Sequence, residues 1–126
     1  MSIKMLHTCV RVKDLDASMK FYRDGLGLVE TSRKDFPEFK FTLVYLSTHV
    51  GGYEIELTYN YDTEKPYEMG TGFSHTAIGV DDLEGERERH ISLGYEVTDL
   101  KGLPGEAPRY YFVTDPDGYK VEVIRN

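Results

Sequence analysis

The hydrophobic pattern of the chain predicts a βαβββ module that occurs twice. In the first copy, residues 6–12 alternate between the two faces of a strand, and residues 14–27 have helical spacing behind an acidic cap at Asp14 or Asp16. Three further strands are expected near Leu28–Ser32, Phe39–Leu46 and Tyr53–Tyr59. The second copy is expected to consist of a strand at Ser74–Val80, a helix at Asp82–Ser92, and strands near Tyr95–Leu100, Arg109–Thr114 and Tyr119–Ile124.

Two short matches in the sequence support a duplicated module. "HTCVRVKDL" at residues 7–15 returns as "HTAIGVDDL" at residues 75–83, a shift of 68 residues. "YEIEL" at residues 53–57 returns as "YKVEV" at residues 119–123, a shift of 66. The matches keep the same order, and loops of different length account for the small difference in shift. The sequence predicts one domain over residues 1–126, with modules at about 4–60 and 73–126 and a polar linker at about 61–72.

Strand alternation predicts that the repeated polar residues lie on the faces of the sheets opposite the helices. In the first strand, the face under the helix is expected to carry Leu6, Thr8, Val10 and Val12. The opposite faces then present His7, Cys9, Arg11, Glu54, Glu56 and Thr58 in the first module, and His75 and Glu122 in the second. If these open faces close on each other, two imidazoles and two carboxylates converge.

Such a donor set is typical of a divalent metal site. The mixture of nitrogen and oxygen ligands suits Zn, Ni, Co or Mn better than a metal that prefers thiolates. With four protein ligands, an octahedral ion keeps two positions for water or substrate oxygens, as catalysis requires. The remaining histidines, His49 in a turn and His90 in a charged run on a helix expected to be solvated, are assigned structural roles.

The composition of the chain argues against several classes of protein function. The chain has 126 residues, of which 40% are hydrophobic, and a net charge of −7, which argues against a nucleic-acid partner. Cys9 is the single cysteine, so no internal disulfide is expected and a reducing compartment fits. No signal peptide or membrane-spanning run is recognised, which predicts a cytoplasmic protein without a membrane partner.

The motifs "LHTCVRVKDLDASMKFY", "IELTYNY", "GFSHTAIGVDD" and "DPDGYKVEVI" resemble those of glyoxalase I (lactoylglutathione lyase) in the vicinal oxygen chelate superfamily. The resemblance covers nearly the whole chain. It implies an α+β fold in which two βαβββ modules form curved mixed sheets around a metal-binding cup. It also implies that the metal ligands are His7, Glu56, His75 and Glu122.

The implied reaction converts the hemithioacetal of methylglyoxal and glutathione to S-lactoylglutathione through a metal-bound enediolate. Glu122 is implied as the main base and Glu56 as its counterpart across the substrate. Arg11 and Asn60 match the positions that bind the γ-glutamyl end of glutathione. Longer members carry another arginine before the second histidine, where this chain has Thr71. The glycyl carboxylate then needs another cation, and Lys101 or Arg109 are the candidates.

The short form of the chain resembles the bacterial subgroup activated by Ni or Co rather than Zn, with one divalent metal per site. Members of this size are usually homodimers, which implies that His7 and Glu56 of one chain meet His75 and Glu122 of the other. Other readings are a CoA-ester epimerase, an extradiol dioxygenase, or a module of the same fold that sequesters small molecules without catalysis. The "ELTYN" segment disfavours the epimerase, the fourth ligand disfavours the dioxygenase, and the ligands disfavour the sequestering module.

Overall fold

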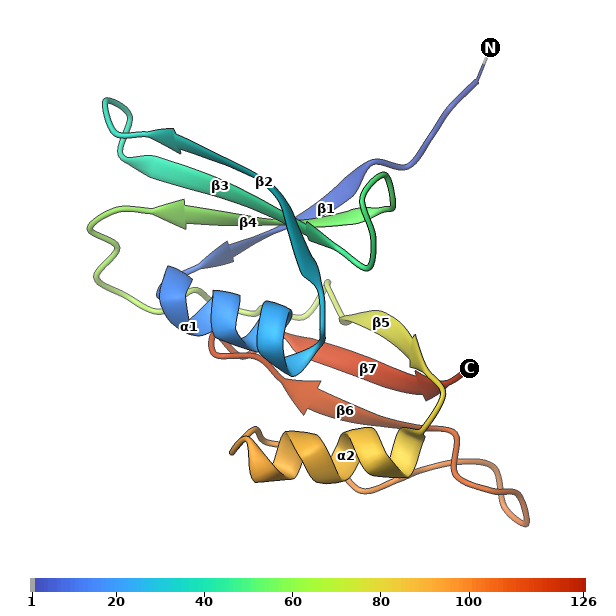
Figure 1. The fold of residues 1–126 in the computed structure, drawn as a ribbon. Coiled ribbons are helices and arrows are strands. Elements are labelled where there is room, and N and C mark those ends of the chain that lie inside the picture. Colours follow the sequence, from blue (N-terminus) through green and yellow to red (C-terminus); the bar gives the residue numbers. More distant parts are fainter. Residues whose placement is uncertain (1) are drawn as a thin grey trace. The chain divides into compact units, whose positions relative to one another are not determined.

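A computed structural model describes residues 2–126 and separates into two compact units, which meet in the sequence between Tyr67 and Glu68 (Figure 1). The first unit contains, in order, β1 (His7–Val12), α1 (Leu15–Met19), η1 (Lys20–Gly25), β2 (Val29–Phe36), β3 (Phe41–Ser47) and β4 (Glu54–Asn60). The second contains β5 (His75–Val80), α2 (Leu83–Ser92), β6 (Tyr110–Thr114) and β7 (Lys120–Arg125).

Both units contain a small mixed sheet in which the first strand pairs with the last. The sheet of the first unit has the order β1-β4-β3-β2, and the sheet of the second has the order β5-β7-β6. The pairs β1–β4 and β5–β7 are parallel, whereas the remaining pairs are antiparallel. A parallel pair needs a crossover connection, and the helix together with the intervening strands supplies it in each unit. The expected α+β fold with two related modules is confirmed.

Aspartate residues cap both helices, and the sequence analysis predicted the first of these caps. The Asp14 carboxylate accepts a hydrogen bond from the backbone N–H of Ala17, and the Asp82 carboxylate accepts one from Gly85. These bonds satisfy amide donors that have no partner within the helix. Of the two caps proposed for the first helix, Asp14 rather than Asp16 fills the role. The helix then changes from α geometry to π geometry at Lys20.

One face of each sheet is buried in the pattern expected from alternation. The buried side chains on this face of the first unit include Val10, Val12, Val44, Leu46, Ile55 and Leu57. The prediction was wrong for Leu6, which precedes β1 and is 62% exposed. An alternating pattern cannot show that strand pairing begins only at His7, since that depends on where β4 starts.

The second unit differs from the predicted module at two places. The strand expected near Tyr95–Leu100 is absent among the described residues, and only isolated bridges at Val97 and Lys101 join this segment to β6. The helix α2 is not solvated at His90, which is fully buried and lies 2.7 Å through Nδ1 from the Tyr111 hydroxyl. This buried contact agrees with the structural role predicted for His90, whereas the expected exposure to solvent was wrong.

A tight turn sets the start of β7, the strand that carries Glu122. Asp115 is 4% exposed, and its Oδ1 accepts hydrogen bonds from the backbone N–H groups of Asp117, Gly118 and Tyr119 at 2.8–2.9 Å. Gly118 has a φ of 105°, which a residue with a Cβ rarely adopts. One buried carboxylate therefore accepts hydrogen bonds from three backbone amides of the turn.

We predict that Asp115→Ala lowers the free energy of unfolding by about 2 kcal/mol, because three part-buried amides lose a charged acceptor. Asp115→Asn retains a carbonyl oxygen at the same position, so its loss should be about half as large. Urea unfolding of both variants beside the unchanged protein measures the difference. Equal losses in the two variants would contradict this account of the turn.

Candidate functional site

The first predicted ligand pair, His7 and Glu56, lies on adjacent parallel strands. In the pairing of β1 with β4, His7 is opposite Glu54 and Cys9 is opposite Glu56. His7 and Glu56 are therefore diagonal neighbours on one face, because paired residues point to the same side of a sheet. Their side chains approach to 3.7 Å between Nε2 and Oε2. Glu56 is 9% exposed, so this carboxylate is largely removed from water.

The second pair, His75 and Glu122, repeats this arrangement on β5 and β7. His75 is opposite Lys120 and Ala77 is opposite Glu122, so the histidine and the glutamate again lie diagonally across a parallel ladder. The distance from His75 Nε2 to Glu122 Oε1 is 3.1 Å. On the other side of the ring, Nδ1 lies 2.7 Å from the Ser74 hydroxyl. This contact occupies Nδ1 and leaves Nε2 directed at the carboxylate.

An aromatic ring supports the histidine in each pair. Tyr45 on β3 is opposite Glu56, and Phe112 on β6 is opposite Glu122. The Tyr45 ring meets the His7 ring edge-on at 5.5 Å between centroids, and the Phe112 ring meets the His75 ring in the same way at 5.1 Å. Edge-on contact restricts rotation of the imidazoles and thereby limits the directions in which Nε2 can point.

The carboxylate of Glu56 has several hydrogen-bond donors around it. The Tyr45 hydroxyl donates to Glu56 Oε2, and the Thr58 hydroxyl lies 3.5 Å from Oε1. Burial raises the pKa of Glu56, but hydrogen bonds from Tyr45 and Cys9 and the charge of His7 outweigh it, so the pKa lies below its ordinary value. The same contact, together with burial, raises the pKa of Tyr45 to about 12. Glu56 is therefore held in its ionised form.

The donor separations of both pairs are close to those of two ligands on one divalent metal ion. Neighbouring donors at about 2.1 Å from an ion lie about 3.0 Å apart in octahedral and about 3.4 Å apart in tetrahedral geometry. The separation of 3.1 Å in the second pair agrees with these values, and the separation of 3.7 Å in the first pair exceeds them slightly. No cluster of three or more histidine, cysteine, aspartate or glutamate side chains suited to a metal occurs among residues 2–126. The structure thus brings the predicted ligands together in pairs, one pair in each unit.

The residues predicted to bind the γ-glutamyl end of the substrate also lie on the open face of the first unit. Arg11 follows Cys9 on the same face of β1 and is opposite Thr58. Asn60 ends β4, and its amide donates to the Tyr67 hydroxyl at 3.3 Å. Arg11 therefore shares a sheet face with His7 and Glu56, whereas Asn60 is already engaged by the segment that follows β4.

In the second unit, Glu122 borders a cavity of about 320 Å³ whose other lining residues are Gly102, Leu103, Arg109, Tyr110 and Ile124. Lys101, the predicted substrate-binding cation, is exposed and is not part of this lining. Its backbone pairs with Tyr110, and its carbonyl accepts from the amide of Arg109 at 2.7 Å. Arg109 is thus the cation that shares a cavity with Glu122.

The sequence analysis missed the paired aromatic residues and Ser74. A usable signal existed, because Tyr45 and Phe112 are 67 residues apart, between the shifts of 68 and 66 that relate the two modules. Ser74 directly precedes His75, but its contact with Nδ1 depends on the side-chain rotamers, which strand alternation does not predict.

Residues 4–123 match the model of the Glyoxalase/Bleomycin resistance protein/Dioxygenase superfamily. The lactoylglutathione lyase of Haemophilus influenzae is 46% identical over 98% of this chain and 93% of its own length. The structure of the trypanothione-dependent glyoxalase I of Leishmania major superposes with a TM-score of 0.90 at 36% identity, covering 98% of this chain and 87% of that one. Glyoxalase I of Zea mays gives a TM-score of 0.91 at 36% identity, covering 98% of this chain and 44% of that one.

The chain belongs to the Glyoxalase/Bleomycin resistance protein/Dioxygenase superfamily. A second lactoylglutathione lyase, from Neisseria meningitidis, is 38% identical over 98% of this chain. These relatives confirm the predicted enzyme class, lactoylglutathione lyase. Within residues 2–126, no helix is long and apolar enough to cross a membrane.

Proposed function

We propose that this chain is a metal-dependent glyoxalase I, which isomerises the hemithioacetal of methylglyoxal and glutathione to S-lactoylglutathione. The observation that carries this proposal is the duplicated histidine–glutamate pair, with separations of 3.7 Å and 3.1 Å at equivalent register positions. A glyoxalase I needs such a donor set together with a carboxylate beside the substrate. The lactoylglutathione lyases that resemble this chain over nearly its full length support the same reaction.

The proposed ligands of one divalent ion are His7, Glu56, His75 and Glu122, and we expect Ni or Co in preference to Zn. When bound, the ion polarises the oxygens of the substrate and thereby lowers the cost of removing a proton from carbon. The mixture of imidazole and carboxylate donors supports a borderline divalent metal. The contact of Ser74 with His75 and the edge-on aromatic contacts supply the orienting partners that metal ligands require.

The proposed role of Glu122 is to move the proton between neighbouring carbons of the substrate. Its carboxylate takes the proton from the carbon that bears sulfur and returns it to the adjacent carbon, so that the reaction is an isomerisation without net oxidation. Two observations favour Glu122 over Glu56 in this role. Glu122 borders the cavity with Arg109, whereas Glu56 accepts a hydrogen bond from Tyr45 and has a lowered pKa. Glu56 then serves as the counterpart on the other side of the substrate.

We also propose a homodimer in which each site combines His7 and Glu56 of one chain with His75 and Glu122 of the other. Each unit supplies one pair of ligands, and a pair alone leaves an ion with too few protein donors to bind tightly, so two pairs must combine. That the second pair comes from another chain is what the resemblance to glyoxalase I of this size implies. We propose the cytoplasm as the location, where glutathione is available and the single Cys9 stays reduced.

The decisive experiment is the formation of thioester from methylglyoxal and glutathione by protein that has been stripped of metal and reloaded with Ni²⁺, Co²⁺ or Zn²⁺. We expect no turnover without metal, turnover with Ni²⁺ and Co²⁺, and less with Zn²⁺. Absence of activity with every metal would contradict the proposal. A protein that binds no metal and is inert would instead favour the small-molecule-sequestering module, and activity on a CoA ester would favour the epimerase.

Removing the proposed base should abolish most of the turnover. Glu122→Ala is expected to lower kcat by about 10²–10⁴-fold, because both a proton acceptor and a proposed ligand are lost. Glu88→Ala, which removes an exposed carboxylate from α2, is the matched control and should keep normal turnover. Steady-state kinetics of the two variants with Ni²⁺ provide the measurement. Near-normal turnover of Glu122→Ala would refute the role of this residue.

The two candidate cations for the glycyl carboxylate can be separated by mutation. Because Arg109 lines the cavity beside Glu122 and Lys101 does not, Arg109→Ala should raise KM about tenfold with little change in kcat. Lys101→Ala should leave KM within about twofold. Kinetics with glutathione and with trypanothione as the thiol also show which thiol the cavity accepts. A larger KM effect from Lys101→Ala would reverse the assignment.

A further inference from the structure

The two ligand pairs are built on the same register but have different chemistry at the residue opposite the glutamate. Tyr45 faces Glu56 and Phe112 faces Glu122, and both rings meet their histidine edge-on. The aromatic ring therefore occupies an equivalent place in each module. The difference is a single hydroxyl, which the first module carries and the second does not.

The Tyr45 hydroxyl is hydrogen-bonded to the carboxylate of Glu56. The Tyr45 hydroxyl donates to Glu56 Oε2, the same oxygen that lies 3.7 Å from His7 Nε2. With the Thr58 hydroxyl 3.5 Å from Oε1, both oxygens of Glu56 have polar neighbours. Oε1 of Glu122 lies 3.1 Å from Nε2 of His75. The Phe112 ring has no polar atom that could contact the Glu122 carboxylate. A carboxylate with donors on both oxygens has fewer orientations available than one with a partner on a single oxygen.

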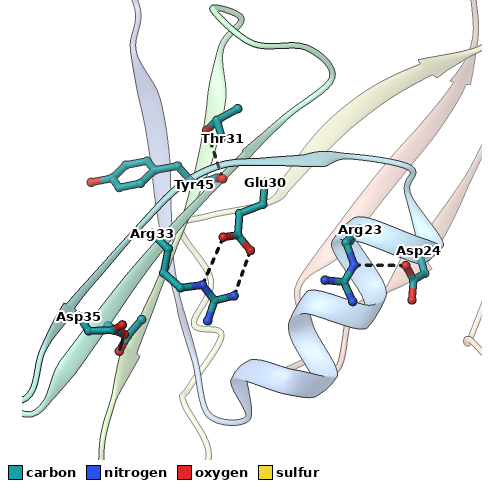
Figure 2. A network of polar contacts seen from close by, with 8 residues as sticks. Arg23, Asp24, Glu30, Thr31, Arg33, Asp35 and Tyr45 are labelled. Atoms are coloured by element: carbon teal, nitrogen blue, oxygen red, sulfur yellow. Dashed lines mark hydrogen bonds and ion pairs between the residues drawn. The ribbon is translucent and has the colours of Figure 1, made fainter.

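Tyr45 is itself fixed by the sheet. β2 has a bulge between Glu30 and Ser32, and the Thr31 hydroxyl at this bulge lies 3.2 Å from the backbone carbonyl of Tyr45 (Figure 2) and also contacts the carboxylate of Glu54. Bulges re-aim side chains close to functional sites. The Tyr45 ring is further held by its edge-on contact with His7. The hydroxyl that contacts Glu56 is thus placed by backbone pairing and by ring packing.

We propose that Tyr45 is a positioning residue that holds Glu56 as a fixed metal ligand, and that Phe112 leaves Glu122 as the carboxylate able to turn toward the substrate. This inference rests on the proposed function. It explains how two pairs with the same register take different roles: the hydroxyl opposite Glu56 competes for the lone pairs that proton transfer would use. The two modules are then unequal because of one aromatic residue in each.

The test measures metal affinity separately from catalysis. Purified full-length protein is stripped of metal, and its affinity for Co²⁺ is measured by competition with a chelating dye, together with the visible absorption spectrum of the Co²⁺ form. Tyr45→Phe should weaken Co²⁺ binding by about 10–100-fold and shift the absorption bands, since the orientation of Glu56 is lost. Tyr53→Phe removes a hydroxyl that contacts Thr8 and serves as the matched control, with unchanged affinity and spectrum.

The mirror variant, Phe112→Tyr, places a hydroxyl opposite Glu122. We expect kcat to fall by about tenfold or more with no loss of Co²⁺ affinity, because the added donor occupies the proposed base without loosening a ligand. Circular dichroism and the melting temperature establish that each variant is folded. A folded Tyr45→Phe variant with unchanged Co²⁺ affinity and spectrum would overturn the proposal, as would a Phe112→Tyr variant with unchanged kcat.

The failure of this inference differs from a failure of the proposed function. If the unchanged protein binds Co²⁺ but forms no thioester, the glyoxalase assignment is wrong, and the affinity and spectrum of Tyr45→Phe still decide the positioning role. If the unchanged protein forms thioester and Tyr45→Phe binds Co²⁺ normally, the glyoxalase assignment stands and the role of Tyr45 is refuted.

Discussion

The parallel pairing of the first and last strands in each module is the constraint on which the candidate site depends. In β1–β4 and in β5–β7, this pairing places a histidine diagonally beside a glutamate on one sheet face. A slip by one residue would turn every side chain of the slipped strand to the other face and separate the pair. The buried valine, leucine and isoleucine side chains on the opposite face prevent that slip, because the same slip would expose them to water. Core packing and ligand geometry are therefore fixed by one register.

The two modules share this register but differ in their surroundings. The first sheet keeps all its strands, whereas the second reduces one strand to isolated bridges at Val97 and Lys101. That loss leaves the segment before β6 irregular, and its residues Gly102 and Leu103 line the cavity beside Glu122. The carboxylate proposed to move the proton thus lies next to a cavity, whereas Glu56 lies opposite Tyr45 within a continuous sheet. The asymmetry of the two modules is consistent with different roles for their carboxylates.

Most of the fold was predictable because the strands alternate clearly and acidic residues cap both helices. The errors occurred where nonlocal pairing or burial decides the outcome. Leu6 fits the alternation but lies before the point at which β4 pairs with β1, and it is exposed. The segment near Tyr95–Leu100 has the composition of a strand but forms only isolated bridges with its neighbour. His90 lies in a charged run, yet its ring is buried against Tyr111 because only one side of α2 faces solvent.

The duplicated module, the family and the four polar residues repeated on matching strands could be recognised from the sequence, because period-two alternation and the spacing between the copies are local properties of the chain. The groups that surround those residues became known only from the folded chain. The contact of Tyr45 with Glu56, the contact of Ser74 with His75, and the place of Arg109 beside Glu122 depend on rotamers and on loop paths. Side-chain rotamers are selected by packing against residues that are distant in sequence, and the pattern of hydrophobic and polar residues does not predict that packing.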